Sequence, residues 1–248
     1  TLRSRRQAIN INLDISFSFL GNKKFTPRPF QLEAWKNYAE RKHQLIHSAT
    51  GSGKTLAALG GFLSQLPPQA KPSIVRCLYI VPLKSLTRDL EKAICKFLTT
   101  TNHSVETYTG DSTSRVKSMI KKKPPAILLT TPESLSILLS TPKSIVLFSK
   151  LECVIVDEWH QLLPNKRGVQ TQLCLARILS FSPDARLIGM SATLENPHEI
   201  IRVNTALIYN SLDYSKIVVP SSHEKEKLNK ELIESKKALI FNNQFFNF

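Results

Sequence analysis

The chain has 248 residues, of which 42% are hydrophobic and 21% charged, and its net charge at pH 7 is +15. This length can bury the core of one or two domains, and no apolar run approaches the roughly 20 residues of a membrane helix. The positive charge favours a polyanionic partner, although a lysine-rich proteome would also explain it. The four cysteines form no C-x-x-C pair, so we expect free thiols in a cytoplasmic protein; they are Cys77, Cys95, Cys153 and Cys174.

The first motif lies at residues 25–31, and residues 1–24 before it are expected to be an N-terminal extension. The amide of Gln31 offers a donor and an acceptor, which match the edge of an adenine base. A lone glutamine on a helix is usually only solvated. Its position shortly before a phosphate-binding loop is what indicates a role in nucleotide binding.

An expected strand at residues 44–47 leads into this loop, whose sequence from 48 to 55 is S-A-T-G-S-G-K-T. Its glycines allow a tight turn that aims N–H groups at phosphate oxygens, while Lys54 would reach the β- and γ-phosphates and the Thr55 hydroxyl would bind Mg²⁺. Ser48 stands where the general G-x-x-x-x-G-K-[ST] pattern has glycine, so A-x-x-G-x-G-K-T fits instead. A chance glycine-rich turn is the alternative. The expected ATP-binding residues are Ala49, Thr50, Gly51, Ser52, Gly53, Lys54 and Thr55.

A second expected strand, residues 77–81, precedes a helix expected over residues 83–97, where apolar residues recur at three- and four-residue steps. Pro82 is expected in the first helical turn, which tolerates proline. Lys84 and Ser85 therefore stand near a helix N-terminus, whose free N–H groups suit the phosphates of a nucleic acid.

A third expected strand, residues 126–130, ends at Thr131 and Pro132, which begin another helix. This helix start would face a nucleic-acid backbone in the same way as the preceding one. The turn at residues 109–111 could add a backbone contact. Considered singly, each of these helix starts is equally consistent with an ordinary N-cap.

The fourth expected strand, residues 153–156, ends in D-E-W-H, in which Asp157 can hold a metal ion and Glu158 can align a water. The fifth, residues 186–190, ends in S-A-T. The hydroxyls of Ser191 and Thr193 could bond His160 or Asp157, which would link a nucleotide site to a strand-binding site.

These runs are short, apolar and separated by helical patterns, which predicts an α/β fold with a doubly wound, mainly parallel sheet flanked by helices. Every motif follows a strand, at the edge where ligands bind in such sheets. We expect one domain over residues 25–203 and a tail over residues 204–248, too short for a second nucleotide-binding lobe.

The ordered motifs Gln31, A-x-x-G-x-G-K-T, P-L-K-S-L, T-T-P-E-S-L, D-E-W-H and S-A-T resemble those of superfamily 2 DExH-box helicases. Residues 156–170, with residues 29–35 and 131–136, resemble more narrowly the large helicase-related (Lhr-type) and ligase-associated DNA helicases. The resemblance covers residues 25–200 and implies a P-loop NTPase fold, the first RecA-like lobe. Pro164 departs from it, because a glycine is more usual there.

This resemblance implies a role for each matching residue. Gln31 would read adenine, Asp157 would hold Mg²⁺ through water, and Glu158 would position or deprotonate the attacking water. His160, Ser191 and Thr193 would couple hydrolysis to strand movement, and the residues along the nucleic-acid backbone would be Lys84, Ser85, Thr131 and Pro132. The implied ligands are ATP, Mg²⁺ and single-stranded or partly duplex DNA, with RNA as an alternative. Relatives move 3′ to 5′ in DNA repair, which adds a DNA ligase and a nuclease as expected partners.

In such helicases, hydrolysis needs arginines from a second RecA-like lobe, and no Q-x-x-G-R-x-x-R-like segment follows Thr193. Residues 238–243 resemble the first strand of that lobe, with an unrelated terminal strand as the alternative. We therefore expect a truncated or fragmentary helicase with weak or no activity alone.

Three other functions are alternatives to this one. A GTPase needs Asn-Lys-x-Asp, and residues 165–168 lack the aspartate. A kinase-like enzyme would transfer phosphate to a small acceptor, for which no lid or acceptor site is evident. A non-catalytic remnant that binds nucleic acid or a partner stays open, although the intact Lys54, Asp157 and Glu158 argue against decay of the site.

Overall fold

The computed structural model describes residues 26–67, 74–99, 101–162, 166–192 and 215–218. Their strands form one seven-stranded sheet in the order β3-β4-β2-β5-β6-β1-β7, in which every neighbouring pair is parallel. The strands are β1 (His43–His47), β2 (Cys77–Ile80), β3 (Val105–Tyr108), β4 (Ile127–Thr130), β5 (Cys153–Val156), β6 (Arg186–Ser191) and β7 (Ser215–Val218). No described helix is long and apolar enough to cross a membrane.

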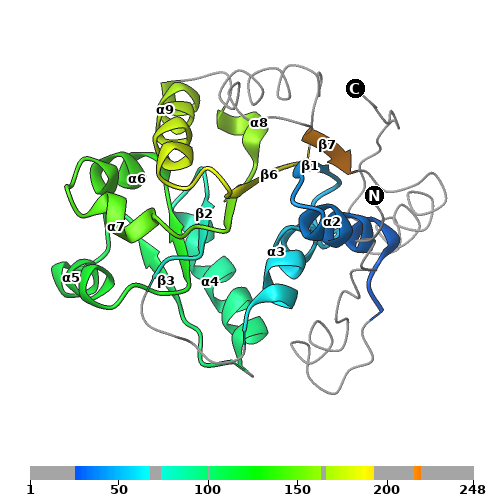
Figure 1. Cartoon of the computed structure of the whole chain (residues 1–248), viewed down its shortest axis with the longest axis horizontal. Helices are drawn as coiled ribbons and strands as arrows, with labels where there is room; N and C mark the ends of the chain where they lie inside the picture. Colours follow the sequence, from blue (N-terminus) through cyan, green and yellow to red (C-terminus); the bar gives the residue numbers. More distant parts are fainter. Residues whose placement is uncertain (1–25, 68–73, 100, 163–165, 193–214, 219–248) are drawn as a thin grey trace, which may run out of the picture.

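The helices cover both faces of this sheet (Figure 1). One face carries α2 (Pro29–Ala39), α3 (Lys54–Gln65) and α4 (Ser85–Leu98). The other carries α5 (Ser114–Lys122), α6 (Pro132–Leu139), α7 (Ser144–Phe148), α8 (Trp159–Leu162) and α9 (Lys166–Phe181). Neighbouring residues of β2 alternate between the two cores, since Leu78 packs with the second group and Tyr79 with the first.

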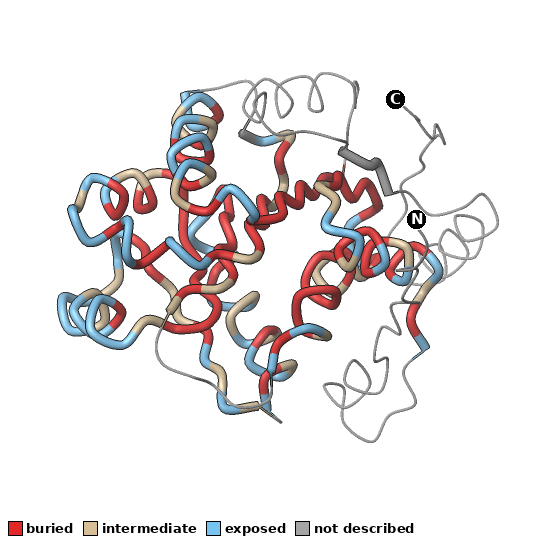
Figure 2. Tube along the Cα trace, viewed as in Figure 1, coloured by how far each residue is buried: buried red, intermediate tan, exposed pale blue. Residues whose placement is uncertain are grey.

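All five expected strands are present, with ends shifted by no more than a residue, and β2, β4, β5 and β6 are buried along their whole length (Figure 2). Strands covered on both faces read as continuous apolar runs, which is why the sequence predicted them. The sequence did not predict β3, because this edge strand reads V-E-T-Y and its two middle residues are only partly buried. It also did not predict β7, which lies in the expected tail and pairs with β1. The domain boundary at residue 203 stays a prediction.

The expected start of the helix over residues 83–97 is wrong. Helix α4 begins at Ser85, so Pro82 and Leu83 precede its first turn. The carbonyl of Lys84 accepts hydrogen bonds from both the amide and the hydroxyl of Thr87, which closes the first turn there. As a consequence, Leu83 is 44% exposed at the edge of the sheet and contributes nothing to the core.

Helices α2 and α3 pack closely because α3 carries two glycines at the contact. A Cβ on Gly60 would lie 2.2 Å from the Trp35 ring nitrogen, and a Cβ on Gly61 would lie 2.6 Å from the Cβ of Tyr38. The same Trp35 nitrogen donates a 3.1 Å hydrogen bond to the Leu56 carbonyl of α3. This packing fixes the start of α2 beside the start of α3, where the phosphate-binding loop ends.

Candidate nucleotide site and nucleic-acid interface

The motifs meet at the carboxyl edge of four adjacent strands, β2, β5, β6 and β1. The phosphate-binding loop follows β1, D-E-W-H follows β5, and Ser191 ends β6. The amide of Asp157 donates a 2.8 Å hydrogen bond to the Ile80 carbonyl of β2, and the amide of Ser48 donates one of 3.2 Å to the Ser191 carbonyl. Segments more than a hundred residues apart in the sequence therefore form one site.

The backbone of the phosphate-binding loop has the geometry that the glycine pattern predicts. Gly51 and Gly53 have φ angles of 79° and 95°, in the left-handed region that favours glycine. A Cβ on Gly51 would meet nothing within 4 Å, so the loop is open on that side. Within the described residues, the buried Ser48 and Ser52 hydroxyls have no hydrogen-bond partner. An open, donor-rich loop at the N-terminus of α3 fits a bound phosphate chain.

Lys54 is the cation of this loop, and its side chain is only 8% exposed. Its ammonium donates a 2.8 Å hydrogen bond to the Ser48 carbonyl and lies 4.0 Å from a Glu158 carboxylate oxygen. Burial lowers the pKa of Lys54, and the neighbouring carboxylates of Glu158 and Asp157 only partly oppose this effect. A phosphate brought to the ammonium would favour its charged form.

Asp157 is held by two hydrogen bonds, one to each carboxylate oxygen. The Tyr79 hydroxyl donates to one at 3.0 Å, and the Glu158 amide donates to the other at 2.9 Å. Burial and the charge of Glu158 raise the pKa of Asp157 to about 6, in spite of these hydrogen bonds. Burial and Asp157 also raise the pKa of Tyr79 well above its usual value, so this hydroxyl keeps its proton. Asp157 and the Thr55 hydroxyl offer the oxygen ligands that Mg²⁺ prefers.

Glu158 lies in the left-handed region with a φ of 42°, which is uncommon for a residue other than glycine. Its carboxylate lies 3.4 Å from Nδ1 of His160, and the same nitrogen lies 2.9 Å from the Ser191 hydroxyl. The expected contact between Ser191 and His160 is therefore confirmed. The Ser191 carbonyl also accepts the hydrogen bond from the Ser48 amide. Ser191 of β6 therefore contacts both D-E-W-H and the phosphate-binding loop. Thr193 lies outside the described residues.

Gln31 is buried at the start of α2, and both ends of its amide are engaged within the protein. Its oxygen accepts a 2.9 Å hydrogen bond from the Arg28 amide, and its nitrogen donates one of 3.1 Å to the Gly53 carbonyl. A Cβ on Gly53 would lie 2.6 Å from that nitrogen, so glycine is needed there for this contact as well as for the backbone. Gln31 thus positions the phosphate-binding loop, while its contact with adenine stays a prediction.

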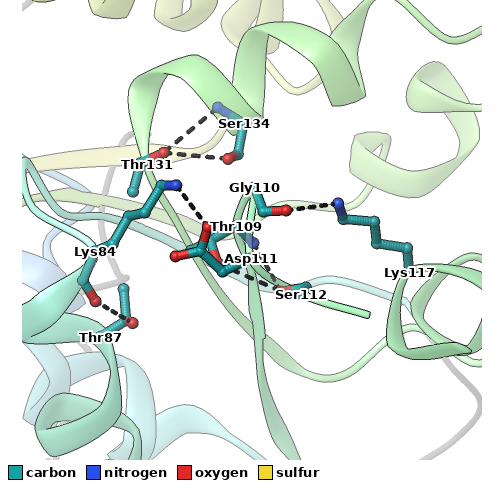
Figure 3. Close-up of polar contacts among 9 residues, drawn as sticks. All are labelled: Lys84, Thr87, Thr109, Gly110, Asp111, Ser112, Lys117, Thr131 and Ser134. Atoms are coloured by element: carbon teal, nitrogen blue, oxygen red, sulfur yellow. Dashed lines mark hydrogen bonds and ion pairs between the residues drawn. The ribbon is translucent and has the colours of Figure 1, made fainter. Parts of the chain in front are cut away.

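The expected nucleic-acid face contains exposed basic side chains that are already paired (Figure 3). The Lys84 ammonium lies 2.9 Å from the Asp111 carboxylate, and Lys117 donates a 3.1 Å hydrogen bond to the Gly110 carbonyl. Ser85 is exposed at the first position of α4. Figure 3 places the turn with Gly110 and Asp111 beside Lys84, so a nucleic acid that binds Lys84 must compete with Asp111.

Thr131 is buried, and its hydroxyl accepts a hydrogen bond from the Ser134 amide at 3.4 Å (Figure 3). It is therefore the N-cap of α6, with Pro132 at the first helical position. The alternative of an ordinary N-cap is confirmed for Thr131, whereas its contact with nucleic acid stays a prediction.

Sequence reasoning missed two side chains that hold this edge together, Arg167 and Tyr79. Arg167 lies 2.6 Å from the carboxylate of Glu133 on α6 and donates a 3.3 Å hydrogen bond to the Pro82 carbonyl after β2. It therefore ties the starts of α4, α6 and α9 to one another. Tyr79, whose hydroxyl donates to Asp157, is predicted from the sequence only as part of a buried strand. The motif stretch contained Arg167, but no local signal revealed its partners.

The sheet is doubly wound and parallel, and it places the phosphate-binding loop at a helix N-terminus, two strands from the paired carboxylates. This combination defines a RecA-like ATP-binding lobe. Comparison with known proteins places this lobe in a family. The sequence profile of the DEAD/DEAH box helicases matches residues 28–200, and the chain belongs to that family.

Lhr-type helicases are among the relatives that the chain resembles, as the motifs indicated. Over 200 residues it is 39% identical to the ATP-dependent helicase Lhr-Core of Methanothermobacter thermautotrophicus, covering 75% of this chain and 23% of that protein. It is 35% identical to the Lhr helicase/probable uracil glycosylase of Mycolicibacterium smegmatis, covering 75% and 14%. The structure of Mycobacterium smegmatis helicase Lhr bound to ssDNA and AMP-PNP matches with a TM-score of 0.73 at 30% identity, covering 84% of this chain and 27% of that one. The chain spans about a quarter or less of the curated relatives' length.

Proposed function

We propose that this chain is the first ATP-binding lobe of a helicase that couples ATP hydrolysis to movement along single-stranded DNA. The observation that carries this proposal is the double role of Ser191. Its carbonyl accepts from Ser48 of the phosphate-binding loop, and its hydroxyl contacts His160, which in turn approaches Glu158. A displacement of the phosphate-binding loop would therefore be transmitted to β6 and D-E-W-H through two hydrogen bonds.

Each polar group of the site has a distinct task in this proposal. The loop amides and the Lys54 ammonium bind the phosphates, and the Thr55 hydroxyl and Asp157 carboxylate hold Mg²⁺. When bound, Mg²⁺ neutralises charge on the β- and γ-phosphates. Glu158 would orient the attacking water and accept its proton on the carboxylate, one oxygen of which lies 4.0 Å from the Lys54 ammonium.

The lobe supplies only part of the positive charge that hydrolysis requires. Among the described residues, the cationic groups within 4.0 Å of the Glu158 carboxylate are Lys54 and, when protonated, His160. Arginines that stabilise the transferring phosphate are worth about 10³–10⁵ in rate where they have been measured. We propose that they come from a second RecA-like lobe and that this chain alone turns over ATP weakly or not at all.

The nucleic acid would lie across the starts of α4 and α6, near Lys84, Ser85 and Thr131. Helix N-termini offer unpaired N–H groups to backbone phosphates, and the net charge of +15 favours a polyanion. We propose DNA as the strand, with RNA as the alternative. We also propose that the helicase moves from 3′ to 5′, acts in DNA repair in the cytoplasm, and cooperates with a ligase and a nuclease. These proposals rest on the resemblance to Lhr-type and ligase-associated helicases.

The proposal is tested by measuring three quantities with the purified chain and with Lys54→Ala: binding of Mg·ATP, ATP turnover, and binding of a labelled single-stranded oligonucleotide. We expect salt-sensitive DNA binding by both proteins and little or no ATP turnover by either. Brisk DNA-stimulated hydrolysis that Lys54→Ala abolishes would contradict the incomplete site. Failure of the chain to bind Mg·ATP, with DNA binding intact, would instead favour a non-catalytic remnant.

A further inference from the structure

Tyr79 is a buried polar residue that no helicase motif in the sequence includes. It lies in the middle of β2, is completely buried, and packs its ring in the core between the sheet and the helices α2, α3 and α4. A phenylalanine would fill the same space without placing a hydroxyl in an apolar core. The hydroxyl of Tyr79 therefore requires a reason of its own, because buried tyrosine hydroxyls usually have a hydrogen-bond partner.

The partner of this hydroxyl is a carboxylate that would hold the metal ion. The Tyr79 hydroxyl donates to the Asp157 carboxylate at 3.0 Å. Asp157 directly follows β5, which pairs with β2. Tyr79 and Asp157 are 78 positions apart in the sequence, so only the fold creates this contact.

The hydrogen bonds to Asp157 determine which of its lone pairs can face a cation. One carboxylate oxygen accepts from the Tyr79 hydroxyl and the other accepts from the Glu158 amide. These two bonds fix the carboxylate plane and leave further lone pairs for a ligand.

We propose that Tyr79 is a positioning residue for the divalent cation, because its hydroxyl holds the Asp157 carboxylate in the orientation that the cation needs. This inference rests on the proposed function, since it concerns the Mg²⁺ of the same nucleotide site. It adds a residue that acts on the cation through a proposed ligand, Asp157.

The test is a Mg²⁺ titration of a fluorescent AMP-PNP analogue bound to wild type and to Tyr79→Phe. The nucleotide affinity is measured first in EDTA and then at rising Mg²⁺ concentration, and the readout is the concentration at half-maximal enhancement. Tyr108→Phe is the matched control, because Tyr108 is also a buried tyrosine but lies on the edge strand β3, two strands from β2. Thermal unfolding of all three proteins without ligand reports whether the fold is kept.

We expect Tyr79→Phe to raise the Mg²⁺ concentration at half-maximal enhancement by about 10- to 100-fold, the usual effect of losing a group that orients a metal ligand. Its affinity for the nucleotide in EDTA should equal that of wild type, and Tyr108→Phe should behave as wild type throughout. An unchanged Mg²⁺ requirement in Tyr79→Phe would overturn the inference, as would an equal loss of binding with and without Mg²⁺. If wild type itself shows no Mg²⁺ enhancement, the proposed function fails and the inference with it.

Discussion

The carboxylate of Asp157 should destabilise the metal-free protein at neutral pH, and Asp157→Asn should remove this effect. The amide has the shape of the carboxylate but only one oxygen, so it can accept from the Glu158 amide and loses the hydrogen bond from the Tyr79 hydroxyl, at a cost of about 1–2 kcal/mol. The substitution therefore removes a buried charge with little change in packing. We expect the variant to be more stable than wild type at neutral pH although it loses a proposed metal ligand.

The magnitude follows from the pKa of Asp157, which burial and Glu158 raise from 3.8 to about 6. Between these two pH values the folded protein binds more protons than the unfolded chain, so its free energy of unfolding falls as the pH rises. The loss is complete above about pH 6 and corresponds to about 3 kcal/mol. For a chain of this size, 3 kcal/mol is a change in melting temperature of about 6–12 °C.

The assay is urea unfolding of wild type and Asp157→Asn in EDTA at several pH values from about 4 to 7.5. The stability of the variant relative to wild type should be lowest near pH 4 and should rise by about 3 kcal/mol as the pH passes 6. An advantage that does not depend on pH would refute the reasoning. A wild type that gains stability over the variant as the pH rises would refute it as well.

Two further predictions concern packing and the nucleic-acid face. Gly60→Ala should lower stability by about 3 kcal/mol or more, measured by thermal unfolding, because its Cβ would lie 2.2 Å from the Trp35 ring nitrogen; a gain of about 1 kcal/mol, as in an exposed helix, would contradict the close contact. Lys84→Ala should weaken binding of single-stranded DNA and lower its salt dependence by about one counterion, whereas Asp111→Asn should strengthen binding by releasing Lys84. Effects in the same direction in an anisotropy titration would show that Asp111 does not compete with the nucleic acid.

The buried strands and the backbone of the phosphate-binding loop could be predicted because local patterns determine them. Strands covered on both faces, such as Cys153–Val156, leave an apolar run of the right length, and the positive φ angles of Gly51 and Gly53 follow from the spacing of the loop glycines. The edge strand Val105–Tyr108 leaves no such run, because its two middle residues are only partly buried. The predicted start of α4 was wrong for a related reason. Leu83 continues the apolar period of the helix in the sequence, but it precedes the first helical residue, Ser85.

The connections within the site could not be predicted, because they join residues far apart in the sequence. Nothing near Tyr79 indicates that its hydroxyl reaches Asp157 at the end of the neighbouring strand β5. In the same way, the need for glycine at position 53 has two causes, and only the backbone turn was visible without the Gln31 side chain that lies against it. Local sequence thus predicts which residues meet at the sheet edge, and the fold determines which of them contact each other.

The most direct test of the account is calorimetric titration of the purified chain with Mg²⁺ and AMP-PNP, beside the Lys54→Ala variant. If the chain is an ATP-binding lobe, wild type should bind one nucleotide saturably in Mg²⁺, and Lys54→Ala should bind it far more weakly while unfolding in a single transition as wild type does. The buried Lys54 ammonium, which contacts the Ser48 carbonyl and approaches Glu158, is the reason for this expectation. An absence of binding by wild type, or equal binding by both proteins, would contradict it.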